Sequence, residues 1–205
     1  MTIMKIVTYP HAALKTPAKT VTAFDAALHR LLDDMAETMY ARDGVGLAAN
    51  QVDVLQRVTV IDTGTKEQPA LVEYVNPEIV EASGEMTWDE GCLSFPELYE
   101  RIKRNRKVRV RYQDRHGATH EVEAEGGLLA VALQHEIDHL NGVLFIDRMG
   151  PLKRKLALKD YTRTMKARRE QGAAGEGVAG DGVAAGGQVE GDLAGGRPAD
   201  DGASA

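Results

Sequence analysis

Apolar residues recur at helical spacing in three separate parts of the chain. The first is an amphipathic pattern over 24–40, with Thr22 available as its cap and an Asp-Gly pair beyond its end. The second covers 128–141 and is closed by a glycine, and the third opens at a proline and runs over 151–170. The apolar stripe predicted for this third helix consists of Leu152, Leu156 and Met165. The pattern therefore predicts an N-terminal, a central and a C-terminal helix.

Short segments with the alternation of strands lie between the first and second predicted helices. Four of them, rich in β-branched residues and separated by Gly, Pro, Asn and Asp, are residues 58–62, 71–76, 78–82 and 85–88. A hairpin follows, with 107–112 and 119–124 as its strands and 114–117 as its turn. Val122 and Ala124 are expected to face inward. Because the strands cluster instead of alternating with helices, the pattern predicts an α+β fold with short antiparallel or mixed strands, and not a doubly wound α/β sheet.

Composition separates a folded body from a tail. The chain has 205 residues and a formal net charge of −6, and residues 171–205 contain 11 of its 21 glycines, six acidic residues and one arginine. A segment of this kind has too little apolar surface to form a core. We therefore expect one folded domain over 1–170 and a disordered, acidic, Gly/Ala-rich tail over 171–205.

The compartment is predicted from the N-terminus and the cysteine count. The first residues lack the apolar stretch of a secretory signal, and no segment approaches the roughly 20 apolar residues of a membrane helix. We therefore expect a cytoplasmic protein with no membrane partner. The single cysteine, Cys92, cannot form an internal disulfide, and in a reducing compartment it is a small buried hydrophobe, a metal ligand or a nucleophile.

The motif with the clearest chemistry is the sequence His-Glu-Ile-Asp-His inside the second predicted helix. Positions i and i+4 share a helix face, so His135 and His139 can bind one metal ion while Glu136 acts as a base. The alternative is a pair of surface histidines on an exposed helix. A catalytic metal also needs a third protein ligand and an open position. No histidine follows His139, which leaves downstream acids such as Asp147, or Cys92 from before the helix.

Three segments resemble the signature motifs of bacterial peptide deformylases, and they occur in the order found in that family. They are GVGLAANQ at 44–51, EGCLS at 90–94 and QHEIDHLNG at 134–142. The resemblance covers residues from about 4 to 168 and leaves out the Gly/Ala-rich tail. It implies a deformylase-like catalytic domain with sheets packed around a central metal-binding helix. The implied activity is metal-dependent removal of the N-formyl group from the initiator methionine of nascent polypeptides, which releases formate.

The resemblance also implies roles for single residues. Glu136 shuttles the proton, and Gln51 together with the backbone N–H of Leu93 stabilises the oxyanion that forms in the reaction. The implied cofactor is one divalent ion per chain, Fe²⁺ in preference to Zn²⁺, and both ions accept imidazole and thiolate ligands. The metal ligands implied by the resemblance are Cys92, His135 and His139.

Contacts with N-formylmethionyl peptides are implied in the same way. Gly46 and the carbonyl of Gly91 are expected to pair with the substrate backbone, which requires an exposed strand edge near the metal. Tyr99 stands where many relatives carry an arginine near the substrate entrance. The candidates for the methionine pocket, each with plain core packing as its alternative, are Val45, Trp88, Leu128, Leu129 and Val131.

Two acidic residues in the motifs are interpreted as supporting groups. We expect Glu90 to pair with Arg104, with a solvated position or an outer-shell position as the alternatives. Asp138 is interpreted as a structural residue or as an acceptor behind a ligating histidine, since such histidines usually need one.

Two other functions are compatible with parts of the sequence. A metallopeptidase would use the same helix, but it needs another downstream ligand and gives Gln51 and Cys92 no role. An RNA- or ribosome-binding module would use the helix over 151–170, whose bases suit phosphates, with a solvated helix face as the plain alternative. The resemblance favours this helix as a ribosome-docking accessory to catalysis. Its eight bases are Lys153, Arg154, Lys155, Lys159, Arg163, Lys166, Arg168 and Arg169.

Overall fold

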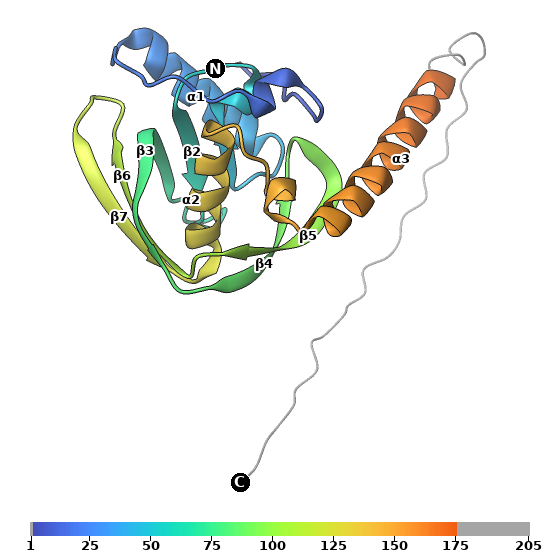
Figure 1. Ribbon diagram of the computed structural model, residues 1–205. Helices are drawn as coiled ribbons and strands as arrows, with labels where there is room; N and C mark the ends of the chain where they lie inside the picture. The colour runs from blue at the N-terminus through green and yellow to red at the C-terminus, as the bar shows by residue number, and fades with distance from the viewer. Residues whose placement is uncertain (1, 176–205) are drawn as a thin grey trace, which may run out of the picture. The chain divides into compact units, whose positions relative to one another are not determined.

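Figure 1 shows the computed structural model, which describes residues 2–175 of the chain. Met1–Lys166 form one compact unit, and a second unit begins at Ala167. The helices are α1 (Ala26–Tyr40), α2 (Gly127–Leu140) and α3 (Pro151–Gly175), with the short 3₁₀ helices η1 (Ala12–Lys15), η2 (Ala49–Val52) and η3 (Phe145–Arg148). The strands are β1 (Gly46–Ala48), β2 (Val58–Asp62), β3 (Leu71–Ser83), β4 (Met86–Cys92), β5 (Phe95–Arg104), β6 (Lys107–Gln113) and β7 (Thr119–Glu125).

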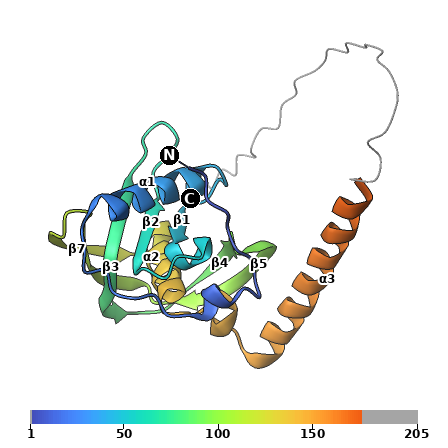
Figure 2. The same cartoon turned by 90° about the horizontal axis from the view of Figure 1, so that it is seen from above.

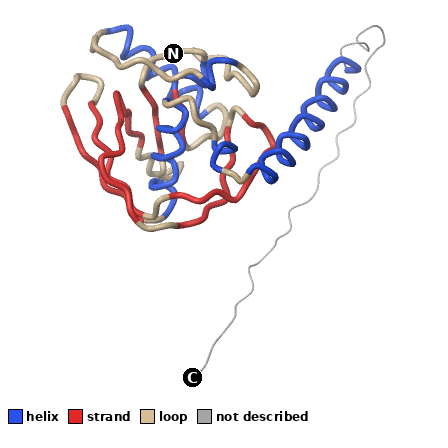
Figure 3. The backbone as a smooth tube through the Cα atoms, in the orientation of Figure 1, coloured by secondary structure: helices blue, strands red, loops and turns tan. Residues whose placement is uncertain are grey.

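The described strands form a five-stranded sheet, in the order β1-β2-β3-β6-β7, and a two-stranded sheet of β4 and β5. Neighbouring strands pair antiparallel in both sheets. Figures 1 and 3 show α2 in the middle of the unit with the five-stranded sheet along one side, and Figure 2 shows α1 near β1 and β2. The predicted α+β fold, with sheets around a central helix, is confirmed.

Apolar clusters of the described residues hold these elements together. The first joins α1 to β1 and β2, the second joins α2 to the five-stranded sheet, and the third joins β5, η3 and α3. In the third, the ring centroid of Phe95 lies 5.0 Å from that of Tyr9, 5.3 Å from that of Phe145 and 5.2 Å from that of Tyr161. Aromatic pairs at these separations are favourable beyond the area they bury. They anchor the strand that follows Cys92 and so fix the turn between β4 and β5.

The third strand of the five-stranded sheet differs from its prediction. Residues 71–76 and 78–82, predicted as two strands, form the single strand β3, and its pairing register with β6 shifts where the two predicted strands meet. Asn76 has a φ of 51°, and Pro77 lacks the N–H that a regular ladder needs. The strand therefore bulges at this point and continues, because its neighbours on both sides keep it paired.

The two-stranded sheet is longer than the sequence pattern predicts. The predicted strand 85–88 begins at Met86 and continues to Cys92, and β5 is not predicted at all. Pro96 lies near the start of β5, and charged residues fill most of its exposed positions, which hides the alternation. Cys92 is the last residue of β4, and only a short turn separates it from β5.

α1 and α2 agree with the predicted helices except at the cap of α1. Asp25, and not Thr22, caps this helix: its Oδ1 accepts the backbone N–H of Ala27 at 2.9 Å and that of Leu28 at 3.1 Å. A carboxylate at this position satisfies free N–H groups and also faces the positive end of the helix dipole. Gly142 has a φ of 71° and follows α2 as predicted.

The apolar stripe predicted for α3 is wrong at two of its three positions. Leu152 and Leu156 are 72% and 53% exposed, whereas Ala157 and Tyr161 are buried. Met165 is partly buried against the third cluster, as predicted. Leu152 and Leu156 lie one turn apart, and this spacing is the same whether their face of the helix is buried or exposed. The buried side is decided by Tyr161, whose ring stacks with the aromatic rings of the third cluster.

α3 also runs past the predicted end at residue 170 and continues to Gly175. The remainder of the predicted tail, 176–205, lies outside the described residues, so the division of the chain at 170 stays a prediction. Among residues 2–175, no helix combines the length and the apolar character needed to span a membrane.

Candidate metal centre

Three donor side chains from two elements meet at one point. His135 and His139 face the same side of α2, and Cys92 ends β4. One ligand atom from each of the three lies within 4.8 Å of the others, and Sγ of Cys92 is 3.2 Å from Nε2 of His139. The surface-histidine alternative is wrong, because His135 and His139 are only 8% and 1% exposed.

The hydrogen bonds around these side chains fit a metal site. Nδ1 of His135 lies 2.8 Å from Oε2 of Glu90, which leaves Nε2 of His135 for a metal. Two imidazoles and one thiolate form a donor set suited to Zn²⁺ or Fe²⁺, and three protein ligands leave a position open. Asp147, the other candidate third ligand, is instead bonded to the backbone N–H of Leu144 and paired with Lys15. The described residues therefore fit a divalent ion held through Cys92, His135 and His139.

Glu136 lies beside this centre with its carboxylate buried. It is 5% exposed, and its Oε2 has no hydrogen-bond partner among the described residues. Burial raises the pKa of Glu136 to about 7, although the positive charges of His135 and Arg104 act in the opposite direction. Gly46 of β1 packs against the side chain, since a Cβ at Gly46 would lie 2.9 Å from Cδ of Glu136. With one carboxylate oxygen unpartnered, the group is placed to accept and return a proton.

Gln51 reaches the same centre from η2. It is 1% exposed, and its Oε1 accepts the backbone N–H of Ala48 at 2.8 Å. Its Nε2 donates to Oγ of Ser94 at 3.2 Å and lies 3.6 Å from Sγ of Cys92. Leu93, directly after the cysteine, packs its side chain against the first cluster. The three motifs of the sequence, far apart along the chain, are therefore brought together.

The expected pair of Glu90 and Arg104 is confirmed, and it is part of a larger buried network. Nε of Arg104 donates to Glu90 at 2.6 Å, and a second guanidinium nitrogen donates to Asp138. Asp138 also accepts from Arg148 at 2.9 Å. Asp138 is therefore structural. Glu90 both pairs with Arg104 and serves as the acceptor behind His135, so two of its expected roles are present together. Sequence reasoning did not single out Arg148, and its spacing from Asp138 gave no signal.

Opposing influences act on the Glu90 carboxylate. Burial tends to raise its pKa, but hydrogen bonds from Arg104 and His135, together with their charges, outweigh burial and lower the pKa to about 2. The carboxylate therefore stays charged and remains an acceptor for the His135 ring. This holds the ring in one orientation.

Gly46 and Gly91 lie on strands with an uncovered edge. β1 is an outer strand of the five-stranded sheet, and β4 pairs only with β5 among the described strands. Gly91 pairs with Tyr99 across β4 and β5, and the Tyr99 ring lies over it: a Cβ at Gly91 would be 2.8 Å from Cδ1 of Tyr99. Tyr99 itself is 74% exposed. Gly91 is exposed, whereas Gly46 is buried, so both glycines lie on outer strands but only Gly91 is open to solvent; their pairing with a peptide stays a prediction.

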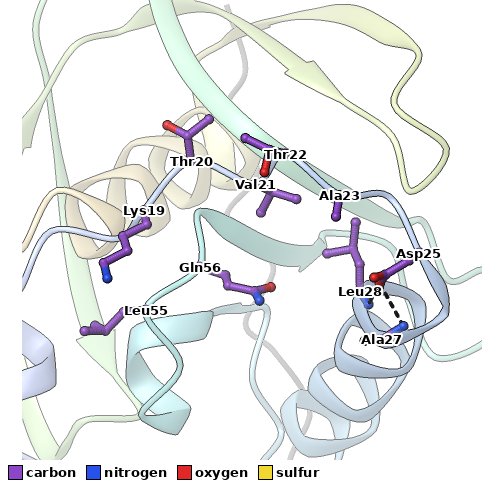
Figure 4. Close-up of a pocket in the computed structure, with 10 residues that line it drawn as sticks. All are labelled: Lys19, Thr20, Val21, Thr22, Ala23, Asp25, Ala27, Leu28, Leu55 and Gln56. Atoms are coloured by element: carbon purple, nitrogen blue, oxygen red, sulfur yellow. Dashed lines mark hydrogen bonds between the residues drawn. The ribbon is translucent and has the colours of Figure 1, made fainter.

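The candidate pocket residues differ in exposure. Val45 and Leu128 are exposed and Trp88 is half-buried, so these three have accessible surface. Leu129 packs against the second cluster, and Val131 is buried. Their roles in binding methionine stay predictions. A hollow of about 300 Å³ lies at the start of α1 (Figure 4), and none of its lining residues belongs to the three motifs; they are Lys19, Thr20, Val21, Thr22, Ala23, Asp25, Ala27, Leu28, Leu55 and Gln56.

An α+β unit with a buried His-Glu-x-x-His helix and a cysteine from a neighbouring strand defines a metal-dependent hydrolase. The family model described as polypeptide deformylase matches residues 3–155. The chain belongs to this family.

Individual relatives agree with this assignment. The peptide deformylase of Wolinella succinogenes is 48% identical over 169 residues, which are 80% of this chain and 99% of that protein. A solved peptide deformylase from Legionella pneumophila is 45% identical, with a TM-score of 0.76 over 82% of this chain and 98% of that chain. The solved deformylase of Ehrlichia chaffeensis in complex with actinonin is 36% identical. Its TM-score is 0.73, and the match covers 80% of this chain and 98% of that chain.

Proposed function

We propose that this enzyme removes the N-formyl group from the initiator methionine of nascent polypeptides and releases formate. The observation that carries the proposal is the convergence of Cys92, His135 and His139, with Glu136 and Gln51 beside them, in a member of the deformylase family. Each of the three motifs contributes at least one of these side chains. Nascent chains as substrates would place the enzyme in the cytoplasm.

The ligand side chains would hold one divalent ion and leave one position for the reacting groups. When bound, the ion polarises the formyl carbonyl and lowers the pKa of the attacking water. The chain supplies rigid ligands: Glu90 fixes the ring of His135 through Nδ1, and Arg104 in turn fixes Glu90.

Glu136 is proposed to move the proton. Its carboxyl group lies in direct contact with Gly46, and its Oε2 has no hydrogen-bond partner among the described residues, so this oxygen is available to accept and return a proton. It takes a proton from the attacking water and delivers it to the amine nitrogen as the C–N bond breaks. The products are then formate and a peptide with a free N-terminal amine.

Gln51 and the backbone N–H of Leu93 are proposed to stabilise the negative oxygen that forms on the formyl carbon. The Gln51 amide suits this role because its oxygen is occupied by Ala48, so its NH₂ group is turned toward Cys92. Donors that are fixed before the reaction favour the transition state without a cost of reorganisation.

The peptide is proposed to bind as an additional strand between the uncovered edges of β1 and β4. Gly46 and the Gly91 carbonyl would supply the main-chain hydrogen bonds. The formyl group would then lie next to Glu136, which packs directly against Gly46. Val45, Trp88 and Leu128 would offer their accessible apolar surface to the methionine side chain.

Ferrous iron is the proposed native ion, with zinc as the alternative. A thiolate beside Fe²⁺ exposes the site to oxidation of both the sulfur and the metal. Air is therefore expected to inactivate the iron-loaded enzyme faster than the nickel-loaded enzyme, measured as residual formate release over time. Equal decay of the two forms would exclude a cysteine-ligated ferrous site.

The basic helix α3 is proposed to dock on ribosomal RNA as an accessory to catalysis. Several of its bases already have partners: Lys153 pairs with Glu100 at 2.8 Å, Arg154 with Asp147 at 3.3 Å and Arg163 with Asp160 at 3.1 Å. Lys155 is therefore a better candidate for a phosphate contact. Replacing it with Gln is expected to weaken ribosome binding and to reduce its salt dependence, with peptide deformylation unchanged.

The metallopeptidase alternative is not favoured. It gives Gln51 and Cys92 no role, yet both side chains border the same centre in a chain that belongs to the deformylase family. Cleavage of an unformylated peptide at an internal bond would revive it.

The deciding experiment is anaerobic purification, metal analysis and measurement of formate release from a formyl-methionyl peptide. The wild type is expected to release formate and to be inhibited by actinonin, the compound present in the Ehrlichia chaffeensis complex. Glu136→Ala is expected to retain its metal and to lose at least about 10²-fold in kcat. Near-normal turnover by the metal-loaded variant would exclude Glu136 as the proton carrier.

A further inference from the structure

The side-chain amide of Gln51 is held at both of its ends. Its Oε1 accepts the backbone N–H of Ala48 at 2.8 Å, and Gln51 is 1% exposed. Because a backbone N–H only donates, the oxygen must be at the Ala48 end of the amide. The NH₂ group therefore faces the opposite way, toward Ser94 and Cys92.

Ser94 is placed to orient one N–H of this NH₂ group. It is in the turn between β4 and β5 and has no exposed surface. Its Oγ accepts one hydrogen of Gln51 Nε2 at 3.2 Å. The second hydrogen of the amide is then directed to the side where Sγ of Cys92 lies, 3.6 Å from Nε2.

The backbones of the two residues are fixed separately. The N–H of Val7 donates to the carbonyl of Gln51 at 2.8 Å, and the N–H of Tyr9 donates to the carbonyl of Ser94 at 3.0 Å. One extended N-terminal segment therefore ties η2 to the β4–β5 turn. Removing the Ser94 hydroxyl is then expected to release the NH₂ end of the Gln51 amide, while Ala48 still holds its oxygen and the two backbones stay together.

We propose that Ser94 is a positioning residue for the deformylase reaction. Its hydroxyl fixes the plane of the Gln51 amide so that one N–H stays aimed at the place where the negative oxygen forms. This inference rests on the proposed role of Gln51 as an oxyanion donor. Ser94 itself donates nothing to the substrate and binds no metal.

A double-mutant cycle tests the proposal. Ser94→Ala is expected to lower kcat by about fivefold to tenfold, the effect of losing one ordinary hydrogen bond, with KM unchanged. Gln51→Leu is expected to lower kcat by about 10²- to 10³-fold. Adding Ser94→Ala to Gln51→Leu is expected to cost nothing more, because the group that Ser94 positions is gone. A full and independent loss from Ser94→Ala in the Gln51→Leu background would overturn the proposal.

The cycle also distinguishes the proposed role of Ser94 from the proposed role of Gln51, on which it depends. If Gln51→Leu leaves kcat unchanged in the metal-loaded enzyme, the oxyanion role of Gln51 is wrong, and the role of Ser94 is overturned with it. If Gln51→Leu lowers kcat as expected but Ser94→Ala does not, only the role of Ser94 is wrong.

A second measurement does not depend on turnover. In the metal-free protein, the ¹⁵N–¹H signals of the Gln51 side-chain amide can be assigned by their disappearance in Gln51→Leu. Ser94→Ala is expected to shift the signal of the hydrogen that Ser94 Oγ accepts, because that hydrogen loses its acceptor, whereas Ser94→Thr keeps the hydroxyl and restores the signal. Unmoved signals in Ser94→Ala would contradict the proposal.

Thr38→Val is the matched control for loss of a buried hydroxyl. Thr38 has no exposed surface, and the hydrogen-bond partners of its Oγ1, the backbone N–H of Met4 at 2.8 Å and the carbonyl of Asp34 at 2.6 Å, both lie outside the three motifs. It is expected to lower thermal stability while kcat and the Gln51 amide signals stay as in the wild type. A drop in kcat like that of Ser94→Ala would show that any lost buried hydroxyl slows the enzyme, and would overturn the proposal.

Discussion

Gly46 and Glu136 are in direct contact: a Cβ added to Gly46 would lie 2.9 Å from Cδ and 3.0 Å from Cγ of Glu136. Glu136 is 5% exposed, so its side chain has little room to retreat. The glycine at this point of β1 is therefore needed for space, and its φ is not in the left-handed region. β1, the edge strand proposed to bind the peptide, therefore packs directly against Glu136, the proposed proton carrier.

Gly46→Ala is expected to displace the Glu136 carboxyl group and to lower kcat by at least about tenfold while the metal is retained. Metal content and kcat of the loaded enzyme check this. Gly150→Ala is a suitable control, since nothing lies within 4 Å of a Cβ added there. A rise in KM with kcat unchanged would show that Gly46 acts only through the peptide backbone.

Arg104→Leu is expected to destabilise the fold by about 3 to 5 kcal/mol, because it leaves two buried carboxylates without their shared partner. The side chains of Glu90 and Asp138 are 2% and 6% exposed. Urea unfolding followed by circular dichroism measures the loss. Arg101→Leu, on the same strand, removes a 71% exposed side chain paired with Asp89 and is expected to cost about 0 to 1 kcal/mol. Similar losses in the two variants would contradict the buried network.

The stability of the metal-free protein is expected to depend on Glu90 at acid pH. The pKa of Glu90 is about 2 in the folded state against an ordinary value of 4.5, so the unfolded state takes up the proton first as the pH falls. The stability due to this group is complete above about pH 4.5 and is lost as the pH falls toward 2. Glu90→Gln is expected to be less stable than wild type at neutral pH, with the difference shrinking over this window. A constant difference would contradict the lowered pKa.

Tyr99 is expected to affect peptides that extend beyond the methionine. Its ring lies over Gly91 and is 74% exposed, next to the proposed peptide-binding edge. Tyr99→Ala is expected to raise KM several-fold for a formylated tetrapeptide and to raise it less for formyl-methionyl-alanine. Equal changes for the two substrates would show that Tyr99 only supports the strand pair. Arg101→Ala, an exposed residue on the same strand, is the control.

The sequence by itself determined the elements whose signals are local. The helices over 26–40 and 127–140, and the hairpin of β6 and β7, follow from side-chain periods and turn residues within a few positions. The shared face of His135 and His139 is equally local, because it depends only on the period of a helix. The motif order was sufficient to indicate the family, which the comparisons confirm.

Only the tertiary structure decided which distant groups meet. Cys92 rather than Asp147 stands beside the histidines because the aromatic contacts of Phe95 fix the β4–β5 turn next to α2. The buried face of α3 was likewise decided by Tyr161, and not by its leucines. Gln51 and Ser94 are 43 positions apart, and their hydrogen bond exists because Val7 and Tyr9 tie their backbones together. A local pattern fixes hydrogen bonding within one element, whereas contacts between elements depend on how whole surfaces pack, which no short stretch of sequence encodes.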